Sequence, residues 1–382
     1  MKVLFIGHFS NSEDVQVGAS AAGDSVQRRI VTSLKCISNA EVNAVAQRPA
    51  KSWPKGRFIF RRAQDSYAIY PITINVAFVR DFVFAIYCFF TILMQRPGKV
   101  VQYNSYFFVN VFVVFASILT KSHTTIIIQD HRSGELFKYF DRLHDRVASK
   151  LVRFYKVAVP VTEPLAFELA LKENSYYVFP GAMEYDRPFE SQGGKCKATT
   201  SANSIVSSSD RKLTIVFAGA LEKHNGICKL LDAWKVIPDN YELIVYGKGG
   251  LKQYVAEIAQ SLPNVTYRGY ANKDVIHQEM MQSDFNVCFR FSDGIDERFF
   301  FPSKFFSVNC YPGFALVNNF SGLPREFQEV GFVINDDMSN IVEVLESKVM
   351  DLKKKTVKRQ EYLFGNYSWS KLFVNVFNGT NS

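Results

Sequence analysis

Short apolar runs alternate with helix-length stretches along most of this chain, and no other feature of the sequence restricts the fold as much. In the first half, apolar runs occupy Val3–Ile6, Glu41–Ala46, Val100–Tyr103 and Thr125–Gln129, and a helical pattern covers Asp24–Cys36. Strands that are separated by helix-length segments are typical of parallel sheets with helices on both faces. The pattern therefore predicts an α/β fold with a doubly wound parallel sheet.

The same alternation starts again near residue 213. Strands are expected at Leu213–Phe217, Tyr241–Tyr246, Val265–Tyr267, Phe285–Phe289 and Phe314–Asn318. Helices are expected at Gly226–Trp234, Gln253–Ser261, Val275–Ser283, Ile341–Leu352 and Tyr367–Phe377. Two halves of this kind predict two Rossmann-like domains that face a cleft.

Between the two halves the composition shifts to small and polar residues. Residues 181–212 include the run SQGGKCKATTSANSIVSSSD, which carries almost no large apolar side chain. Such a composition is typical of a linker or a disordered insertion. We therefore expect an N-terminal domain over residues 1–180, a C-terminal domain over residues 213–360, and a terminal helix over residues 361–382 that packs back on the N-terminal domain.

The composition is that of a globular protein. With 382 residues, of which 47% are hydrophobic and 21% charged, the chain is long enough for two domains with separate cores. The six cysteines form no C-x-x-C pair or metal-ligand cluster, which favours a reducing compartment and no bound metal. The apolar run Met1–Gly7 is too short for a signal peptide, so we expect a cytoplasmic protein and a first buried strand.

The positive charge of the chain belongs to its first half. Residues 1–180 contain 22 Lys and Arg against 13 Asp and Glu, whereas residues 181–382 contain 23 of each kind. A basic domain binds nucleic acid, an anionic membrane surface or a phosphorylated substrate. Because the sequence has no helix-turn-helix, zinc-finger or RNA-recognition signature, we expect no nucleic-acid partner.

Two long apolar segments also lie in this half, at Asp81–Met94 and Tyr106–Leu119. Both are shorter than the ~20 residues that a helix needs to span a bilayer, and we interpret each as a core helix. Basic residues and aromatic side chains beside apolar helices also suit the cytoplasmic leaflet, which leaves peripheral attachment to the inner face of the plasma membrane open.

The segment from Arg290 to Pro324, RFSDGIDERFFFPSKFFSVNCYPGFALVNNFSGLP, concentrates charge after a predicted strand. Arg290 directly follows the strand, Glu297 lies in an acidic and aromatic loop, and Lys304 follows a Pro-Ser pair that is typical of a helix start. This order places the three side chains at the carboxyl edge of a parallel sheet, where open α/β folds bind ligands. The alternative is a charged surface loop with no ligand.

Three more loops follow strands of the second half and are expected to converge on the same edge. In the first, Gly219 permits a sharp turn, Lys223 supplies a cation, and Gly226 opens a helix whose N-terminus can receive a phosphate. Gly247 belongs to a glycine-rich strand exit, VYGKGG. Tyr270 lies in YRGYANK, where backbone groups can border a nucleobase.

In the first half, Gly18 lies in a loop of small residues, VGASAAGDS, before the first helix. The glycine spacing is wrong for a dinucleotide fingerprint. The small side chains would still admit a phosphate or a sugar close to backbone N–H groups. A plain flexible loop is the alternative.

Taken in order, the runs FAGALEKHNGI, IVYGKGG, NVTYRGY, SDFNVCFR and FFFPSKFFSVNCYPG resemble the donor-binding domain of GT-B glycosyltransferases. They are most similar to the family-four-type enzymes, glycosyl transferases group 1, that build bacterial capsule and lipopolysaccharide. The resemblance covers about residues 213–330, and the first half shares only the architecture. It implies transfer of a hexose from a nucleotide-diphospho-sugar to a glycan or a polyprenyl-diphosphate-linked acceptor, without an obligatory metal and with retention favoured.

The resemblance also implies roles for individual residues. Lys223 and Arg290 would neutralise the donor diphosphate with support from Lys304, since fixed cations stabilise the charge that develops on a leaving nucleoside diphosphate. Glu297 would lie near the donor sugar or the ribose. For all four residues the alternative is a solvated surface salt bridge.

On the acceptor side, the run IIIQDHRSGELF places Asp130 and His131 directly after a predicted strand. GT-B enzymes often carry an acid or a His on that side of the cleft, so we interpret Asp130 as the base and His131 as a sugar or phosphate contact. The alternative is an Asp that caps a helix and a His that faces solvent. An Asp base would invert the anomeric centre, so the stereochemical course stays open.

At Ser307 the sequence departs from the family, which usually carries there a Glu that accepts hydrogen bonds from the ribose hydroxyls. Either Glu297 or Asp296 compensates, the donor is unusual, or the protein has lost activity. Two other functions therefore stay open. One is a nucleotide-sugar epimerase on the same two-domain plan, and the other is a non-catalytic GT-B subunit that binds a partner transferase.

Overall fold

The computed structural model describes residues 1–10, 21–37, 39–129, 146–185, 212–293, 296–347 and 349–378. The chain divides into two compact units. Unit 1 combines Met1–Gly181 with Arg298–Phe301 and Trp369–Ser382, and unit 2 combines Ala182–Glu297 with Pro302–Ser368.

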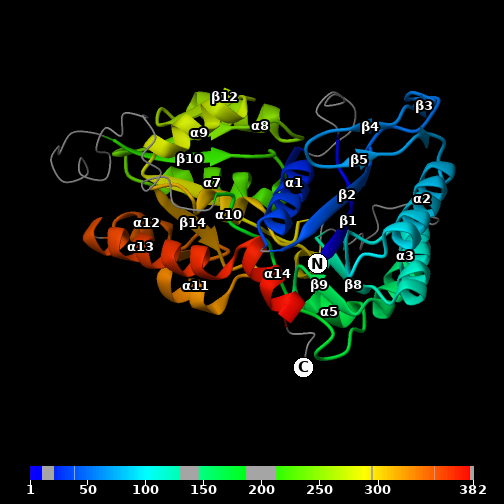
Figure 1. The fold of residues 1–382 in the computed structure, drawn as a ribbon. Helices are drawn as coiled ribbons and strands as arrows, with labels where there is room; N and C mark the ends of the chain where they lie inside the picture. The colour runs from blue at the N-terminus through cyan, green and yellow to red at the C-terminus, as the bar shows by residue number, and fades with distance from the viewer. Residues whose placement is uncertain are drawn as a thin grey trace. The chain divides into compact units, whose positions relative to one another are not determined.

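Unit 1 is built on a seven-stranded sheet in the order β4-β5-β2-β1-β7-β8-β9, parallel throughout except for the antiparallel pair β4–β5 (Figure 1). Its strands are β1 (Lys2–His8), β2 (Glu41–Gln47), β4 (Ala63–Gln64), β5 (Ile69–Tyr70), β7 (Lys99–Tyr103), β8 (His123–Ile128) and β9 (Val157–Pro160). A two-stranded ribbon, β3 (Ile59–Phe60) and β6 (Thr73–Ile74), stands beside it. The helices of unit 1 are α1 (Ala21–Lys35), α2 (Val79–Gln95), α3 (Phe107–Thr120), α5 (Glu163–Glu168) and α14 (Trp369–Asn378).

Helices α2 and α3 cover one face of this sheet. Leu4 of β1 and Ile126 of β8 are buried in one apolar cluster with Phe84 of α2 and Val113 of α3. The other face is contacted by α1, and α14 packs against α1. Residues from the end of the chain therefore belong to unit 1.

Unit 2 carries a six-stranded, wholly parallel sheet in the order β12-β11-β10-β13-β14-β15. Its strands are β10 (Leu213–Ala218), β11 (Tyr241–Tyr246), β12 (Val265–Gly269), β13 (Phe285–Cys288), β14 (Phe314–Asn318) and β15 (Phe332–Ile334). Its helices are α7 (Ile227–Ala233), α8 (Lys252–Ser261), α9 (Lys273–Gln282), α10 (Lys304–Val308), α11 (Arg325–Val330), α12 (Ile341–Leu345) and α13 (Val349–Asn366).

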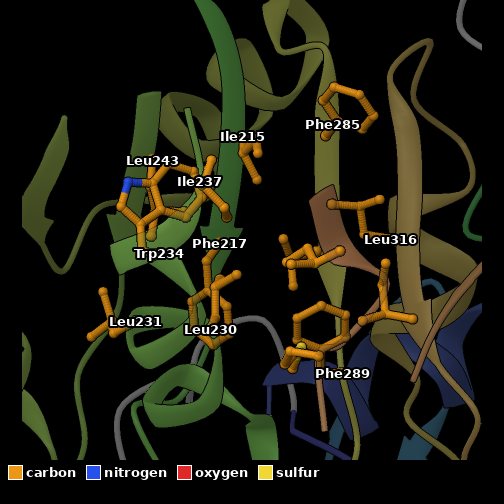
Figure 2. Close-up of a cluster of buried hydrophobic side chains, with 14 of the residues drawn as sticks. Ile215, Phe217, Leu230, Leu231, Trp234, Ile237, Leu243, Phe285, Phe289 and Leu316 are labelled. Carbon is orange, nitrogen blue, oxygen red and sulfur yellow. The ribbon is translucent and has the colours of Figure 1, made fainter. Parts of the chain in front are cut away.

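The core of unit 2 lies between the sheet and α7. Figure 2 shows Leu230 of α7 beside Phe217 of β10 and Trp234 beside Leu243 of β11, and all of them are buried in one cluster with Ile215 and Phe285. This packing holds the carboxyl ends of β10 and β13 at fixed positions.

The strand order of unit 2 reverses at β10. After β10 the chain adds β11 and β12 on one side, then crosses over to place β13, β14 and β15 on the other side. The loops after β10 and β13 therefore leave the sheet in opposite directions and open a space between them, which is where doubly wound sheets bind their ligands. The residues that follow β10 and β13 are thus the first candidates for a site.

The two apolar segments of the first half form helices, as the sequence predicts, but they are only partly core helices. α2 buries Phe84, Cys88 and Ile92, whereas Met94 on the same helix is exposed. No helix among the described residues is long and apolar enough to cross a membrane.

The predicted helix Ile341–Leu352 is wrong. The chain forms two helices here, α12 and α13, and the second extends to Asn366. The Tyr241 hydroxyl donates a hydrogen bond to the Leu345 carbonyl over 3.0 Å, so this carbonyl is satisfied outside the helix. Because the break depends on this tertiary contact, the apolar spacing of the sequence does not reveal it.

Candidate functional site

The backbone of the turn after β10 passes very close to the backbone that follows β11. Gly219 N–H donates to the Tyr246 carbonyl at 3.0 Å, and Gly247 N–H donates to the Gly269 carbonyl at 2.8 Å. A Cβ atom on Gly247 would lie 1.9 Å from the Gly219 carbonyl oxygen, and the φ of Gly247 is 156°. Any side chain at residue 247 would clash with the Gly219 backbone. The fold therefore requires glycine at this position, whether or not a ligand binds.

Lys304 brings an ammonium group to this turn. Its Nζ atom lies 4.7 Å from the centroid of the Phe217 ring and 3.3 Å from the position that a Cβ on Gly219 would occupy. Burial lowers the pKa of Lys304 to about 8. No hydrogen bond or ion pair joins this Nζ atom to a residue in the part of the chain that the structure describes. A partly buried cation without a carboxylate is costly in the free protein and favours an anionic ligand.

Arg290 is held by the neighbouring strand end. Its N–H donates to Asn318 Oδ1 at 2.6 Å, and Asn318 Nδ2 donates to the Arg290 carbonyl at 2.7 Å. From this fixed backbone, Arg290 Nη1 donates to Asn225 Oδ1 at 3.4 Å. The guanidinium thus reaches from the loop after β13 to the loop after β10, across the point where the strand order reverses.

A second contact ties the same two loops together. Phe291 N–H donates to the His224 carbonyl at 2.9 Å. Burial and then the Arg290 charge lower the pKa of His224, so its imidazole is neutral near pH 7. The sequence analysis did not single out His224, because a lone His in a loop carries no motif.

Lys223 and Gly226 lie in the loop after β10, as predicted. Lys223 is the exposed first residue of a short 3-10 helix, Lys223–Asn225. Gly226 has a φ of 76°, and a Cβ there would lie 2.5 Å from Phe291 Cε2. Packing against Phe291 therefore requires this glycine. A phosphate at the start of α7 stays a prediction.

Two predicted donor contacts lie farther from this group or are described only in part. Tyr270 follows β12, the edge strand two positions from β10, and its exposed ring lies 4.6 Å from Lys248 Nζ. Glu297 begins a 3-10 helix, Glu297–Phe299, and it is the last residue of its segment of unit 2. The structure describes the backbone of Glu297 and not its side chain.

Three predicted residues lie outside the described residues. Gly18 belongs to residues 11–20, and Asp130 and His131 belong to residues 130–145. Their roles stay predictions. β8 ends at Ile128, one residue before the predicted end, and Gln129 N–H donates to Asn104 Oδ1 at 2.9 Å.

A carboxylate lies beside Ser307, and it belongs to Glu184. Ser307 Oγ donates to Glu184 Oε2 at 2.7 Å, and Glu184 Oε1 pairs with Lys273 Nζ at 2.6 Å. The sequence analysis missed Glu184 because 123 residues separate it from Ser307. Its position beside the predicted linker offered no motif.

Unit 1 has a polar group of its own at the carboxyl edge of its sheet. His8 ends β1, and its ring stacks on Tyr106 with 3.9 Å between the centroids. Gln47, at the end of β2, donates from Nε2 to Asp81 Oδ1 at 2.9 Å. Burial lowers the pKa of His8 to about 4 in spite of the neighbouring Asp81. A neutral His therefore stands at the end of the central strand.

The described residues contain no group of three His, Cys, Asp or Glu side chains that would hold a metal ion. The expectation of a metal-free reaction stays a prediction.

No protein-family model matches this chain, and no curated protein matches it. Solved structures match it over its whole length. The UDP complex of HepE from Anabaena is 13% identical with a TM-score of 0.66, and the lipopolysaccharide outer core galactosyltransferase WaaB is 12% identical with a TM-score of 0.61. Both matches cover 100% of each chain. A protein from Listeria monocytogenes described as a UDP-N-acetylglucosamine 2-epimerase is 12% identical with a TM-score of 0.55, covering 100% of this chain and 96% of the other.

These likenesses establish the fold. The chain has the GT-B fold, with two Rossmann-like α/β units, and this confirms the predicted fold class and, at the level of the fold, the resemblance to GT-B glycosyltransferases. The narrower resemblance to the family-four-type enzymes stays a prediction.

Proposed function

We propose that this protein is a glycosyltransferase that moves a sugar from a nucleotide-diphospho-sugar to a glycan or lipid-linked acceptor in surface polysaccharide synthesis. The observation that carries the proposal is the ammonium of Lys304, which lies partly buried at the strand-order reversal of unit 2, with no carboxylate paired to it among the described residues. The structural neighbours include a galactosyltransferase and a protein bound to UDP, which supports a donor of this kind.

The cations act on the leaving group. When the bond between the sugar and the diphosphate breaks, negative charge grows on the phosphate oxygen that departs. The backbone of Arg290 is held by Asn318, and the Lys304 ammonium lies over the Phe217 ring beside Gly219, so both cations are close to the place where that charge develops. Lys223, exposed in the same loop as Asn225, adds a third cation. In this mechanism the protein's own cations take the part that a metal takes elsewhere.

We assign the ribose contact to Glu184. Its carboxylate accepts from Ser307 Oγ and has further lone pairs for the ribose hydroxyls, which supply two O–H donors. The Lys273 ammonium pairs with this carboxylate at 2.6 Å, and an ionised acceptor forms the stronger hydrogen bond. The carboxylate that the family usually carries at position 307 is then supplied by Glu184, from another segment of unit 2.

The acceptor chemistry is assigned to unit 1. Asp130 as base and His131 as a sugar or phosphate contact remain the proposed catalytic pair, and the neutral His8 is a third group at the same sheet edge. The proton NMR coupling constant of the product's anomeric proton distinguishes retention, which the family resemblance favours, from inversion by an Asp base.

The experiment is a donor screen with purified full-length protein. A panel of UDP- and GDP-sugars is incubated with a polyprenyl-diphosphate-linked sugar, and the release of nucleoside diphosphate is measured for the wild type, Lys304→Met and Arg290→Ala. We expect release from one class of donor, with a loss of about a hundredfold or more in kcat/KM for both variants. Lys235→Met, whose exposed ammonium pairs with Asp232 at 3.1 Å, is the matched control and should keep full activity.

The same reactions separate the rival functions. An epimerase, which the Listeria neighbour makes the second candidate, converts one nucleotide-sugar into its epimer with no glycosidic product. A non-catalytic subunit gives neither product with any donor. Either result contradicts the transferase proposal.

A further inference from the structure

Unit 1 carries a basic stretch that the proposed reaction does not use. The run KSWPKGRFIFRR, residues 51–62, contains five Lys and Arg and no Asp or Glu. All five cations are exposed: Lys51, Lys55, Arg57, Arg61 and Arg62. The next acid along the chain is Asp65. This stretch therefore accounts for much of the positive charge of unit 1.

Large apolar side chains are exposed among these cations. Trp53 is 53% exposed, Phe58 50% and Ile72 61%. Ile59 and Ile74 are paired residues of the antiparallel β3–β6 ribbon, and both are exposed, so they share one face of it. The Trp53 and Phe58 rings contact each other with 5.9 Å between their centroids. We call these residues and the five cations the ribbon face.

A buried asparagine holds the ribbon face in shape. Asn75 Nδ2 donates to the carbonyls of Lys51 and Arg57, both at 2.8 Å. Trp53 N–H donates to the Asn75 carbonyl at 2.8 Å, and Asn75 N–H donates to the Phe58 carbonyl at 2.7 Å. These hydrogen bonds fix the backbone of the loop that carries the exposed rings of Trp53 and Phe58. Exposure of Trp53 and Phe58 is a feature of this fold.

The apolar surface continues along two helices. β6 contacts α2. α2 lies beside α3 (Figure 1), and between them Phe89 stacks on Phe115 with 5.9 Å between the centroids. Further apolar side chains are exposed on this pair: Val79, Phe82, Phe90, Met94, Phe115, Ile118 and Leu119. Exposed Arg96 and Lys121 follow the two helix ends. Grouped exposures of large apolar side chains mark interaction sites, whereas single scattered ones do not.

We propose that the ribbon face docks on an anionic membrane surface, with Trp53 and Phe58 inserted at the headgroup level and the five cations beside lipid phosphates. Trp and basic side chains are the residues that favour this interface. Each cation near an anionic leaflet strengthens binding electrostatically. The apolar side chains add the free energy of burying apolar surface at the headgroup level. A nucleic acid would leave Ile59, Ile72 and Ile74 without a partner. The proposal does not depend on which reaction the protein catalyses.

The first test is co-sedimentation of the full chain with phosphatidylcholine vesicles, with and without a minority of phosphatidylglycerol. We expect binding to the anionic vesicles and much weaker binding to the neutral ones. Arg61→Gln with Arg62→Gln should weaken partitioning roughly thirtyfold, at about fivefold per cation. Trp53→Ser with Phe58→Ser should weaken it by about tenfold per ring.

Matched controls lie elsewhere on unit 1. Arg153→Gln with Lys156→Gln removes two exposed cations, and Phe167→Ser removes an exposed ring. Both should leave partitioning unchanged. Equal effects of the control and ribbon-face variants, or no binding of the wild type to anionic vesicles, overturn the proposal.

The second test detects membrane insertion directly, through tryptophan fluorescence. It does not require a variant that binds membranes less tightly. The chain has three Trp residues. Trp53 is exposed, whereas Trp234 and Trp369 are buried at 2% and 3%. With lipids brominated near the headgroup, we expect quenching in the wild type and none in Trp53→Phe, although the variant still binds. Quenching that persists in Trp53→Phe places another part of the chain in the membrane and overturns the assignment.

Two further results would also overturn it. One is DNA-oligonucleotide binding as tight as vesicle binding, lost in the charge variant and unchanged in Trp53→Ser with Phe58→Ser. The other is dimerisation of the lipid-free wild type, seen by sedimentation velocity and abolished by the same ring substitutions. The melting temperature of each variant, compared with wild type, separates loss of docking from loss of folding.

Discussion

The Nζ atom of Lys304 lies 3.3 Å from the position that a Cβ atom on Gly219 would occupy. Gly219→Ala therefore pushes the end of a flexible side chain and leaves the backbone in place. We expect a change of less than about 1 kcal/mol in the free energy of unfolding, with at least a tenfold loss of UDP affinity. Chemical denaturation and calorimetric titration measure the two effects. A variant that binds UDP like wild type would show that Lys304 does not contact the donor.

The depressed pKa of Lys304, about 8, makes donor binding depend on pH. Only the ammonium form attracts a diphosphate, so above about pH 8 the protein must take up a proton in order to bind. We expect the Kd for UDP to be constant from about pH 7 to about pH 8 and then to rise about tenfold per pH unit. In Lys304→Met this dependence should disappear. A wild-type Kd that stays flat to about pH 9.5 would contradict the assignment.

The same side chain should lower the stability of the ligand-free protein. Between about pH 8 and the usual lysine value, the unfolded state binds the proton more tightly than the folded state, so stability rises with pH in that window. Below about pH 8 the ammonium is charged in the folded state, so the full free-energy cost of its desolvation remains. Lys304→Met should therefore raise the free energy of unfolding by about 1–2 kcal/mol at neutral pH. Urea unfolding without nucleotide checks this, and a destabilised variant would argue against an unpaired ammonium.

Asn225 is predicted to position Arg290. Its Oδ1 atom accepts from Arg290 Nη1 at 3.4 Å, so Asn225→Ala removes one hydrogen bond of the guanidinium and keeps its charge. We expect a threefold to tenfold rise in the Kd for UDP, against about a hundredfold for Arg290→Ala. In Arg290→Ala the further change Asn225→Ala should have no effect, and a double-mutant cycle measures that coupling. Fully additive losses would show that the two residues act separately.

Glu184 is predicted to recognise the ribose. Glu184→Gln keeps the size of the side chain and removes its charge, so we expect UDP affinity to fall by about tenfold to a hundredfold. Inorganic pyrophosphate has no ribose, and its affinity should stay the same. Titration of both ligands into both proteins gives the comparison. Equal losses for UDP and pyrophosphate would place Glu184 near the phosphates instead.

Much of the fold could be predicted because its cause is local. The alternation of apolar runs and helical stretches is the direct result of strands that are buried on both faces and helices that cover them. The break between α12 and α13 could not be predicted, because it depends on a hydrogen bond from Tyr241, more than one hundred residues away. Nor does apolar spacing show that α2 and α3 expose apolar side chains such as Met94 and Ile118.

The residues of the candidate site also divide into those with a local sequence signal and those without one. Arg290 could be predicted because it follows a predicted strand end, and parallel strands bring such residues to one edge. Lys304 could be predicted because a Pro-Ser pair marks a helix start in the same segment. Their roles remain to be tested. Glu184 could not be predicted, since its contact with Ser307 joins distant parts of the chain and belongs to no motif. His8 and His224 were missed because single histidines carry no spacing that distinguishes a site.

The central claim is that a nucleoside diphosphate binds at the strand-order reversal of unit 2, beside Lys304. Calorimetric titration of UDP and of GDP into the wild type, Lys304→Met and the control Lys235→Met tests it most directly. The account predicts that one nucleotide binds the wild type and Lys235→Met equally, and that Lys304→Met binds it about a hundredfold more weakly. Equal binding to all three proteins, or no binding of either nucleotide to the wild type, would contradict it.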